Sequence, residues 1–337
     1  MLNRYLTMLS TIFLVVLVSG STSAQTGDEL RAIHQEFCTA LNAHDVNQLM
    51  TFYADDAVLD FVPVPPPVSG KGAIREWFES LFRAFPDFQG AHGLVLVSGN
   101  ILIHEHVVSG THLGDWMGIP ATGKKAQVRH IDIFEFEGGK IKRDLIYQDN
   151  LGLLMQLGVM PASDLPELKP SFTLSDPEPT GKDPLEADAD VISRWNSHDM
   201  ADYAKVISSD AEFFIGPLGI PMDCKEYIAA EELYILAFPD VVMKVVHRVN
   251  MGDGWVLTEC VWNGTNDGPY FGLPATGRSV KGLRGVTLAR YDNGLITNLH
   301  IYFDNLTLLT QLGIVQPSEA PAVSSSSWGK VKGMFRR

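Results

Sequence analysis

The stretch Gly-Ile-Pro-Ala-Thr-Gly at 118–123 returns as Gly-Leu-Pro-Ala-Thr-Gly at 272–277, which is 154 residues later. Two further segments repeat in the same order: Ala-Phe-Pro-Asp at 84–87 returns at 237–240, and Gln-Leu-Gly at 156–158 returns at 311–313. Matching segments in a fixed order and at nearly constant spacing indicate a duplicated structural unit. The fold is therefore predicted to be one unit built twice.

The length of the chain suits two domains. With 337 residues, 45% of them hydrophobic, it has enough apolar side chains for two separate cores. We place the first domain at 27–161 and the second at 184–317. Residues 162–183 are rich in proline and acidic side chains, which is typical of a linker. Residues 318–337 are predicted to form a flexible tail.

The N-terminus has the order of a secretory signal peptide. Arg4 precedes a mostly apolar run at 6–18, and small residues follow at 21–24. The run is shorter than the roughly 20 residues that cross a membrane comfortably, so a retained anchor is the weaker alternative. We expect residues 1–24 to be a cleaved signal peptide and the protein to be secreted or periplasmic.

Charge and cysteine content narrow the class further. The formal net charge of -14 argues against nucleic acid as a partner, because binding to phosphate backbones depends on lysine and arginine. Three cysteines, Cys38, Cys224 and Cys260, are too few for a disulfide framework. Cys224 and Cys260 could pair, but buried free thiols are the more common outcome.

Each unit begins with helices and ends with strands. In the first unit, apolar side chains recur at helical spacing in 30–41 and 73–85, and a short helix is predicted between them at 47–53. Strands are predicted at 94–97, 101–109, 125–136 and 140–149. Three helices on a strongly curved antiparallel sheet would give an α+β, cone-shaped domain that encloses a pocket.

The order of these elements and motifs resembles a known family. Gly-Thr-His-x-Gly-x-x-x-Gly-x-Pro-Ala-Thr-Gly at 110–123, Ile-Asp-Ile-Phe at 131–134, and Tyr147-x-Asp149 followed by Gln-Leu-Gly closely resemble the SnoaL-like polyketide cyclases, in the nuclear transport factor 2-like superfamily. The resemblance covers nearly all of the first unit and most of the second. It implies acid/base chemistry inside the cone without a cofactor or metal.

The resemblance also implies which carboxyl reacts. A carboxylic acid on a strand that faces the pocket would exchange a proton next to a substrate carbonyl, and Asp132 is the residue at that position. Asp60 lies one residue from where the base of ketosteroid isomerase would be expected. Because one residue along a strand is the opposite face, Asp60 is only a doubtful partner.

Histidines are expected to gather around Asp132. His130 shares its strand face, since side chains alternate with period two, while His106 and His112 come from the preceding strand and its end. Burial of a carboxyl raises its pKa toward the neutral range, whereas a protonated histidine beside it lowers the pKa. The predicted catalytic residues are therefore Asp132, His112, His106 and His130.

Three alternatives stay open at this stage. Asp132 could point outward, or pair with Arg129 or Lys142. His104 and His106 could face solvent, because antiparallel sheets often have a hydrated side. His-x-His with a further histidine and an aspartate is also a plausible set of metal ligands, although the resemblance implies no metal.

Other residue pairs that recur in both units are interpreted as structural. Asp149 and Asp304 each stand directly before Asn-Leu and an apolar run, which favours helix capping over a role in the pocket. His-Asp at 44–45 and at 198–199 is likewise predicted to cap helices. Pro-Ala-Thr-Gly is predicted to form a turn.

The second unit keeps the scaffold motifs but not the acid/base groups. In place of His104, His106, His112, His130 and Asp132 it has Thr258, Cys260, Asn266, Gly285 and Thr287. This predicts a reactive first domain and a second domain that binds or packs, although two binding domains for unlike ligands fit equally well. Arg284 and His300 could serve a different pocket there.

The expected function is that of a cofactor-independent enzyme which acts in the first domain on a small apolar carbonyl compound. Cyclisation, isomerisation and hydrolysis of an ester or lactone would all fit. The alternative is a non-catalytic carrier or sensor of small hydrophobic molecules. We expect the two units to pack sheet against sheet as a pseudo-dimer within one chain, and association of two chains is left open.

Overall fold

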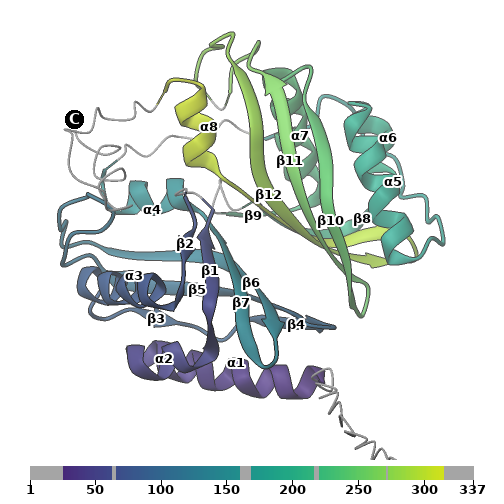
Figure 1. Cartoon of the computed structure of the whole chain (residues 1–337). Helices are drawn as coiled ribbons and strands as arrows, with labels where there is room; N and C mark the ends of the chain where they lie inside the picture. The colour runs from purple at the N-terminus through teal and green to yellow at the C-terminus, as the bar shows by residue number, and fades with distance from the viewer. Residues whose placement is uncertain (1–25, 63–65, 160–167, 216–219, 271, 315–337) are drawn as a thin grey trace, which may run out of the picture.

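The computed structural model describes residues 26–62, 66–159, 168–215, 220–270 and 272–314. Within them the chain forms two domains of the same design, which Figure 1 shows one above the other. The predicted signal peptide and tail lie outside the described residues, as does part of the predicted linker. In the described part, no helix is long and apolar enough to cross a membrane.

The first domain has the predicted helices and long strands, but strands also lie between the second and third helix, where no strand was predicted. Its helices are α1 (Gly27–Asn42), α2 (Val46–Phe52), α3 (Lys71–Ala84) and α4 (Asn150–Gln156). Its strands are β1 (Tyr53–Phe61), β2 (Val68–Ser69), β3 (Gln89–Gly90), β4 (Leu94–Ser98), β5 (Ile101–Thr111), β6 (Lys125–Glu137) and β7 (Lys140–Gln148).

The second domain repeats this order. Its helices are α5 (Pro184–Asn196), α6 (Met200–Ala204), α7 (Cys224–Ala237) and α8 (Asn305–Gln311). Its strands are β8 (Ile207–Ile215), β9 (Ile220–Met222), β10 (Val242–Gly252), β11 (Trp255–Thr265), β12 (Ser279–Asp292) and β13 (Leu295–Phe303). The α+β architecture with one sheet and a set of helices in each domain is confirmed.

The sheets differ from the prediction at one edge. Their strand orders are β2-β1-β7-β6-β5-β3, with β4 also on β5, and β10-β11-β12-β13-β8-β9. The long strands are antiparallel neighbours, but β1 runs parallel to β7, and β8 runs parallel to β13. The sheets are therefore mixed, because the long connection from β1 to β7 lets the chain re-enter the sheet in the same direction. The strong curvature stays a prediction.

The predicted caps are confirmed. The Asp149 carboxylate accepts a hydrogen bond from the Gly152 amide at 2.8 Å, and Asp304 accepts one from Thr307 at 2.9 Å. Asp45 and Asp199 cap α2 and α6 in the same way. Such caps satisfy backbone amides that the first turn of a helix leaves without partners.

The prediction of a turn at Pro-Ala-Thr-Gly is wrong in position: Met117, Gly118 and Gly272 are in turns, whereas 120–123 and 274–277 are irregular backbone directly after them. Trp116 pairs with Ile119 in an isolated bridge, and Tyr270 pairs with Leu273 at the matching place. Gly123 has a φ of 70°, a value that favours glycine because it has no Cβ. Cys38, Cys224 and Cys260 are free thiols.

Each central strand is buried on both faces. The inner face of the first sheet packs against the helices through residues such as Phe134 and Phe136. The outer face, with Ile131 and Ile133, packs against the outer face of the second sheet. That second face contributes residues such as Leu288 and Tyr302, so the two sheets share one apolar layer.

Polar side chains at this layer correct three interpretations. Arg284 forms an ion pair of 2.9 Å with Asp60, so Asp60 is held by the second domain and is not a partner of Asp132. His300 Nδ1 contacts Glu105 at 2.8 Å, and the Tyr302 hydroxyl donates to the same carboxylate. Arg284 and His300 thus bind carboxylates of the first domain instead of serving a pocket of the second.

Candidate active site

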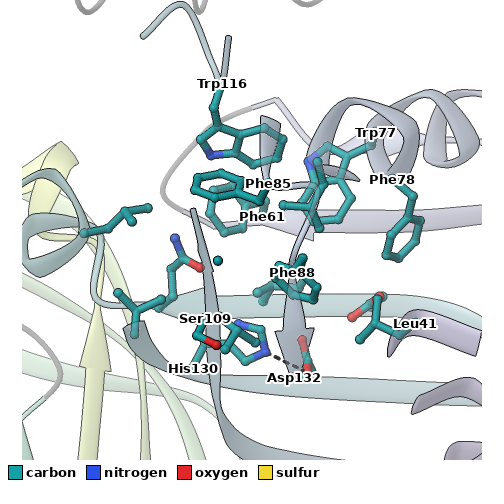
Figure 2. A pocket seen from close by; sticks show the side chains of 18 of the residues that line it. Leu41, Phe61, Trp77, Phe78, Phe85, Phe88, Ser109, Trp116, His130 and Asp132 are labelled. Carbon is teal, nitrogen blue, oxygen red and sulfur yellow. Dashed lines mark ion pairs between the residues drawn. The ribbon is translucent and has the colours of Figure 1, made fainter. Parts of the chain in front are cut away.

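A cavity of about 80 Å³ lies between the helices and the inner face of the first sheet. Its walls are mainly aromatic, with rings from Phe37, Phe61, Trp77, Phe78, Phe85, Phe88, Trp116 and Phe134. Its ionisable residues come from two neighbouring strands: His130, Asp132 and Asp144. Figure 2 shows His130 and Asp132 facing the ring cluster of Phe61, Phe85 and Trp116. An apolar cavity with a few polar groups at one end suits a small ligand that is mostly apolar.

Asp132 lies at the centre of the polar end. Strand pairing sets His104 opposite Asp132 and His106 opposite His130, so all four side chains are on the inner face. The Asp132 Oδ2 atom is 3.1 Å from His106 Nε2 and 3.2 Å from His130 Nε2. The two histidine Nε2 atoms also contact each other directly. The alternatives in which Asp132 pointed outward or the histidines faced solvent are wrong, because all four residues are buried.

The proton positions follow from the neighbours of each ring. His106 Nδ1 lies 3.3 Å from the carbonyl oxygen of Ala91, to which it donates. In a neutral imidazole this leaves a lone pair on His106 Nε2, turned toward Asp132 and His130. A proton on His130 Nε2 can then be shared with both partners. Among the described residues none hydrogen-bonds His130 Nδ1, which leaves that atom able to accept a proton.

Burial and the histidines act on Asp132 in opposite directions. Burial alone would raise the pKa of the Asp132 carboxyl, but the neighbouring His130 outweighs it and holds this pKa below its ordinary value. The pKa of His106 is lowered by burial and by His130, against the attraction of Asp132. Asp132 is therefore ionised at neutral pH, and His106 is neutral.

Asp144 is a second carboxyl in the cavity, which the sequence analysis missed. It is only 1% exposed, and its Oδ2 accepts a hydrogen bond of 2.5 Å from the hydroxyl of Tyr53. Its Oδ1 has no hydrogen-bond partner. Burial and the nearby charge of Asp132 raise the pKa of Asp144 well above its ordinary value, so this carboxyl is protonated at neutral pH. The sequence signal that could have identified Asp144 is the two-residue alternation of the strand, which places Asp144 on the same face as Ile146, another residue of the cavity lining.

A further layer of potential ligands lies beside Asp132. His34 and Cys38 come from α1, and the Cys38 sulfur lies 3.4 Å from His34 Nε2. The His104 ring packs between the rings of His34 and His106, with centroid distances of 4.5 and 3.8 Å. Two sets could hold a metal ion by the spacing of their ligand atoms: His34, Cys38 and His104, and His104, His106 and Asp132.

His112 is not brought into the cavity. Its ring stacks on Phe85 at a centroid distance of 5.1 Å, and its Nδ1 lies 3.2 Å from the Thr122 hydroxyl of the Pro-Ala-Thr-Gly segment. It is fully buried, and it is not among the residues that line the cavity. The structure therefore brings together His106, His130 and Asp132 but leaves His112 outside the cavity lining.

The second domain places its counterparts in the same register. Thr258 lies opposite Thr287, and Cys260 lies opposite Gly285, as His104, His106, Asp132 and His130 do in the first domain. A Cβ on Gly285 would lie 2.2 Å from the Trp262 ring, so that ring takes the place of a side chain there. The matched positions therefore carry no acid/base group, and the second cavity, of about 70 Å³, has a different lining.

Comparison with known proteins agrees with the duplicated architecture. The model of the SnoaL-like polyketide cyclase family matches residues 32–157 and 188–312, which is more than half of the chain. This protein therefore belongs to the SnoaL-like polyketide cyclase family. The comparison with curated proteins gave no match.

Solved structures match one domain at a time. AclR from Streptomyces galilaeus is 23% identical, with 40% of this chain and 100% of that chain covered and a TM-score of 0.37. TsrD from Streptomyces laurentii is 24% identical, with 40% and 99% covered and a TM-score of 0.37. IdmH from Streptomyces antibioticus is 28% identical, with 39% and 99% covered and a TM-score of 0.35.

Proposed function

We propose that the first domain is a cofactor-independent enzyme that moves a proton next to the carbonyl of a small apolar compound. The observation that carries this proposal is a pair of buried carboxyls in one apolar cavity, Asp132 and Asp144, whose surroundings shift their pKa values in opposite directions. Such a divergence is how neighbouring acids take on separate acid and base roles. Family membership implies a small-molecule substrate.

The base in this proposal is the pair of His130 and Asp132. Asp132 is a weak base by itself, because its pKa is held low. Its carboxylate instead orients the His130 ring and stabilises the positive charge that forms when His130 Nδ1 takes a proton. His106 contacts His130 from the opposite strand, and its own ring is held in place by the hydrogen bond from Nδ1 to the Ala91 carbonyl. Asp132 and His106 are thus positioning residues, and His130 is the group that touches the substrate.

The acid is Asp144. Its protonated carboxyl can donate to the substrate carbonyl oxygen from Oδ1, while Tyr53 holds Oδ2. Removal of a proton from the carbon beside the carbonyl breaks a C–H bond, and the electron pair moves to oxygen, where the hydrogen bond stabilises the enolate. Return of a proton at another carbon, or attack of the enolate carbon on a second carbonyl of the same molecule, would give isomerisation or ring closure. Both outcomes leave the substrate without change in oxidation state.

Deuterium exchange tests this proposal most directly. The mature protein in deuterated buffer would be incubated with a panel of apolar ketones, esters and diketones, and label at the activated C–H positions would be followed by NMR. We expect label to enter at least one compound, and His130→Gln, Asp132→Asn and Asp144→Asn to lower the rate by about 100-fold or more.

Surface and chelator controls make the outcome specific. Asp56→Asn changes an exposed carboxyl that binds Lys142, and it should leave the exchange rate unchanged. Treatment with EDTA should also leave it unchanged, whereas loss of activity that zinc restores would move the chemistry to a metal held by His104, His106 and Asp132. If panel compounds bind but none of them exchanges deuterium, the proposal of an enzyme is refuted and the alternative of a non-catalytic carrier is supported.

Export is also part of the proposal, and it rests on residues 1–24 of the sequence. The full-length chain, produced in a host with a secretory pathway, should be recovered outside the cytoplasm with Gln25 at its N-terminus. N-terminal sequencing of the recovered protein gives the answer, and an intact Met1 on a cytoplasmic product would refute export.

A further inference from the structure

The cavity of the second domain is lined differently from the first. It has about the same volume, about 70 Å³, but tyrosine and tryptophan replace most of the phenylalanines. Its rings include those of Trp195, Tyr203, Tyr227, Tyr234, Trp262 and Tyr270. Two carboxyls lie among them, Asp188 from α5 and Glu231 from α7.

The two carboxyls have different partners. Asp188 is paired with the Arg248 guanidinium and also accepts hydrogen bonds from Thr258 and Tyr291, both at 2.9 Å. Glu231 is 7% exposed and accepts a hydrogen bond of 2.7 Å from the Trp195 indole, with a further hydrogen bond to Tyr227. Both partners of Glu231 are neutral, and in the described lining of this cavity there is no lysine, arginine or histidine.

A buried carboxylate without a cation is costly, because neutral donors replace only part of its hydration. The faces of tyrosine and tryptophan rings are also electron-rich and attract cations. An anionic ligand would be repelled by the Glu231 carboxylate, and a neutral ligand would leave Glu231 without a counter-charge. We propose that the second cavity binds a small organic ammonium ion, with Glu231 as its counter-ion and the surrounding rings as its cage.

This inference goes beyond the proposed function, since it concerns the other domain and needs no turnover. It also carries a proton signature. Burial raises the pKa of Glu231 to about 7. Burial also raises the pKa of the surrounding tyrosines, so their hydroxyls stay protonated in the neutral range; these are Tyr203, Tyr227, Tyr234 and Tyr270. A bound cation would therefore displace the proton of Glu231, and affinity should rise with pH through the neutral range.

The test compares two probes of equal shape. Choline carries a quaternary ammonium group, and 3,3-dimethylbutan-1-ol carries a neutral carbon in its place. Calorimetric titration of the full mature chain at pH 8 should show choline binding at least tenfold more tightly than the alcohol. Choline should bind at least tenfold more weakly at pH 5.5 than at pH 8. Equal affinities for the two probes, or no binding of choline, would overturn the inference.

Two neighbouring variants identify the counter-ion. Glu231→Gln should weaken choline binding at least tenfold and remove its pH dependence. Glu232→Gln is the matched control, because Glu232 binds Ser171 and is not part of the cavity lining. If Glu231→Gln fails to fold, proton release by the wild type at pH 7, measured in buffers of different ionisation enthalpy, decides instead. Binding without proton release would contradict the role of Glu231, whether or not the first domain turns over a substrate.

Discussion

Asp144 and Tyr53 form a buried polar pair in the first cavity that should lower the stability of its domain. The carboxyl is buried with one oxygen unpaired, and in the second domain the matching strand position holds Leu299. An apolar residue therefore fits this scaffold, and an acid is not needed for folding. A buried polar atom without a partner costs about 1–3 kcal/mol, which supports a functional reason for its presence.

A double substitution separates the two effects. Asp144→Leu alone should cost about 1–3 kcal/mol of unfolding free energy, because it leaves the buried Tyr53 hydroxyl without a partner. Adding Tyr53→Phe removes that hydroxyl and should bring stability back to within about 1 kcal/mol of the wild type. Chemical denaturation measures both. Deuterium exchange should stay lost in the double variant, and its recovery there would remove Asp144 from the mechanism.

The elements were largely predictable, because local patterns determine them. The periodic helices, the long strands β5 to β7 and the caps at Asp45 and Asp149 all follow from spacing and side-chain chemistry. Strand β1 was missed, since its alternation is interrupted where Asp55 and Asp56 are exposed and its pairing with β7 shifts register. The parallel pairing of β1 depends on a contact between distant segments, which local periodicity does not contain.

The part of the candidate site that lies on the strands β5 and β6 was predictable from the sequence. Alternation placed His130 and Asp132 on one face, and the antiparallel hairpin brought His106 to them. His112 was misplaced because the chain turns before it reaches the cavity, and its ring stacks on Phe85 instead. His34 and Tyr53 come from elements whose distance from β6 depends on tertiary packing, so sequence spacing could not assign them to the cluster.

The short helix α4 depends on its cap. Asp149→Ala should lower the unfolding free energy by about 1 kcal/mol, because it leaves the Gly152 amide unpaired. Asp149→Asn should retain most of the stability, since an asparagine oxygen can accept the same hydrogen bond. Thermal unfolding of both variants gives the comparison. Equal stability of the alanine and asparagine variants would show that this capping hydrogen bond does not stabilise the domain.

At the scale of the whole molecule, ion pairs join the two domains. Arg284→Leu leaves the buried Asp60 carboxylate without its cation and should cost about 1–3 kcal/mol, with part of the effect screened because Arg284 is half-exposed. Lys244→Ala, a change at an exposed residue of β10, should alter stability by less than about 0.5 kcal/mol. Denaturant titration of both variants would detect the difference, and similar values would show that the Asp60 pair adds nothing.

His34 in the first domain and Glu231 in the second should contribute to stability with opposite dependence on pH. Burial lowers the pKa of His34 from 6.5 to about 4, so the stability that depends on His34 falls as pH decreases through this window, while the raised pKa of Asp144 in the same domain acts in the opposite direction. Glu231, with its pKa raised from 4.5 to about 7, destabilises the second domain as pH increases through that range. Each contribution is on the order of 3 kcal/mol.

Hydrogen exchange followed by mass spectrometry resolves this contrast strand by strand. When pH falls from 7 to 4.5, exchange of the β6 amides should accelerate more in the wild type than in His34→Phe after correction for the intrinsic rate, and amides of β12 should exchange faster at pH 8 than at pH 5. His34→Phe and Glu231→Gln should each flatten the response of its own domain. The same slope in both domains would mean that other groups control the pH dependence.

The shared apolar layer between the two sheets has a consequence for how such a molecule can change over time. In a dimer of identical chains, symmetry forces every substitution to appear in both cavities at once. Here the pairing halves lie on one chain, so the contact surface can be preserved while each interior varies independently. One domain could thus keep a histidine cluster while the other acquired a cavity lined by tyrosine and tryptophan. Dilution would not separate the two domains, because they belong to one chain. Duplication in one chain lets a symmetric architecture carry unlike chemistries.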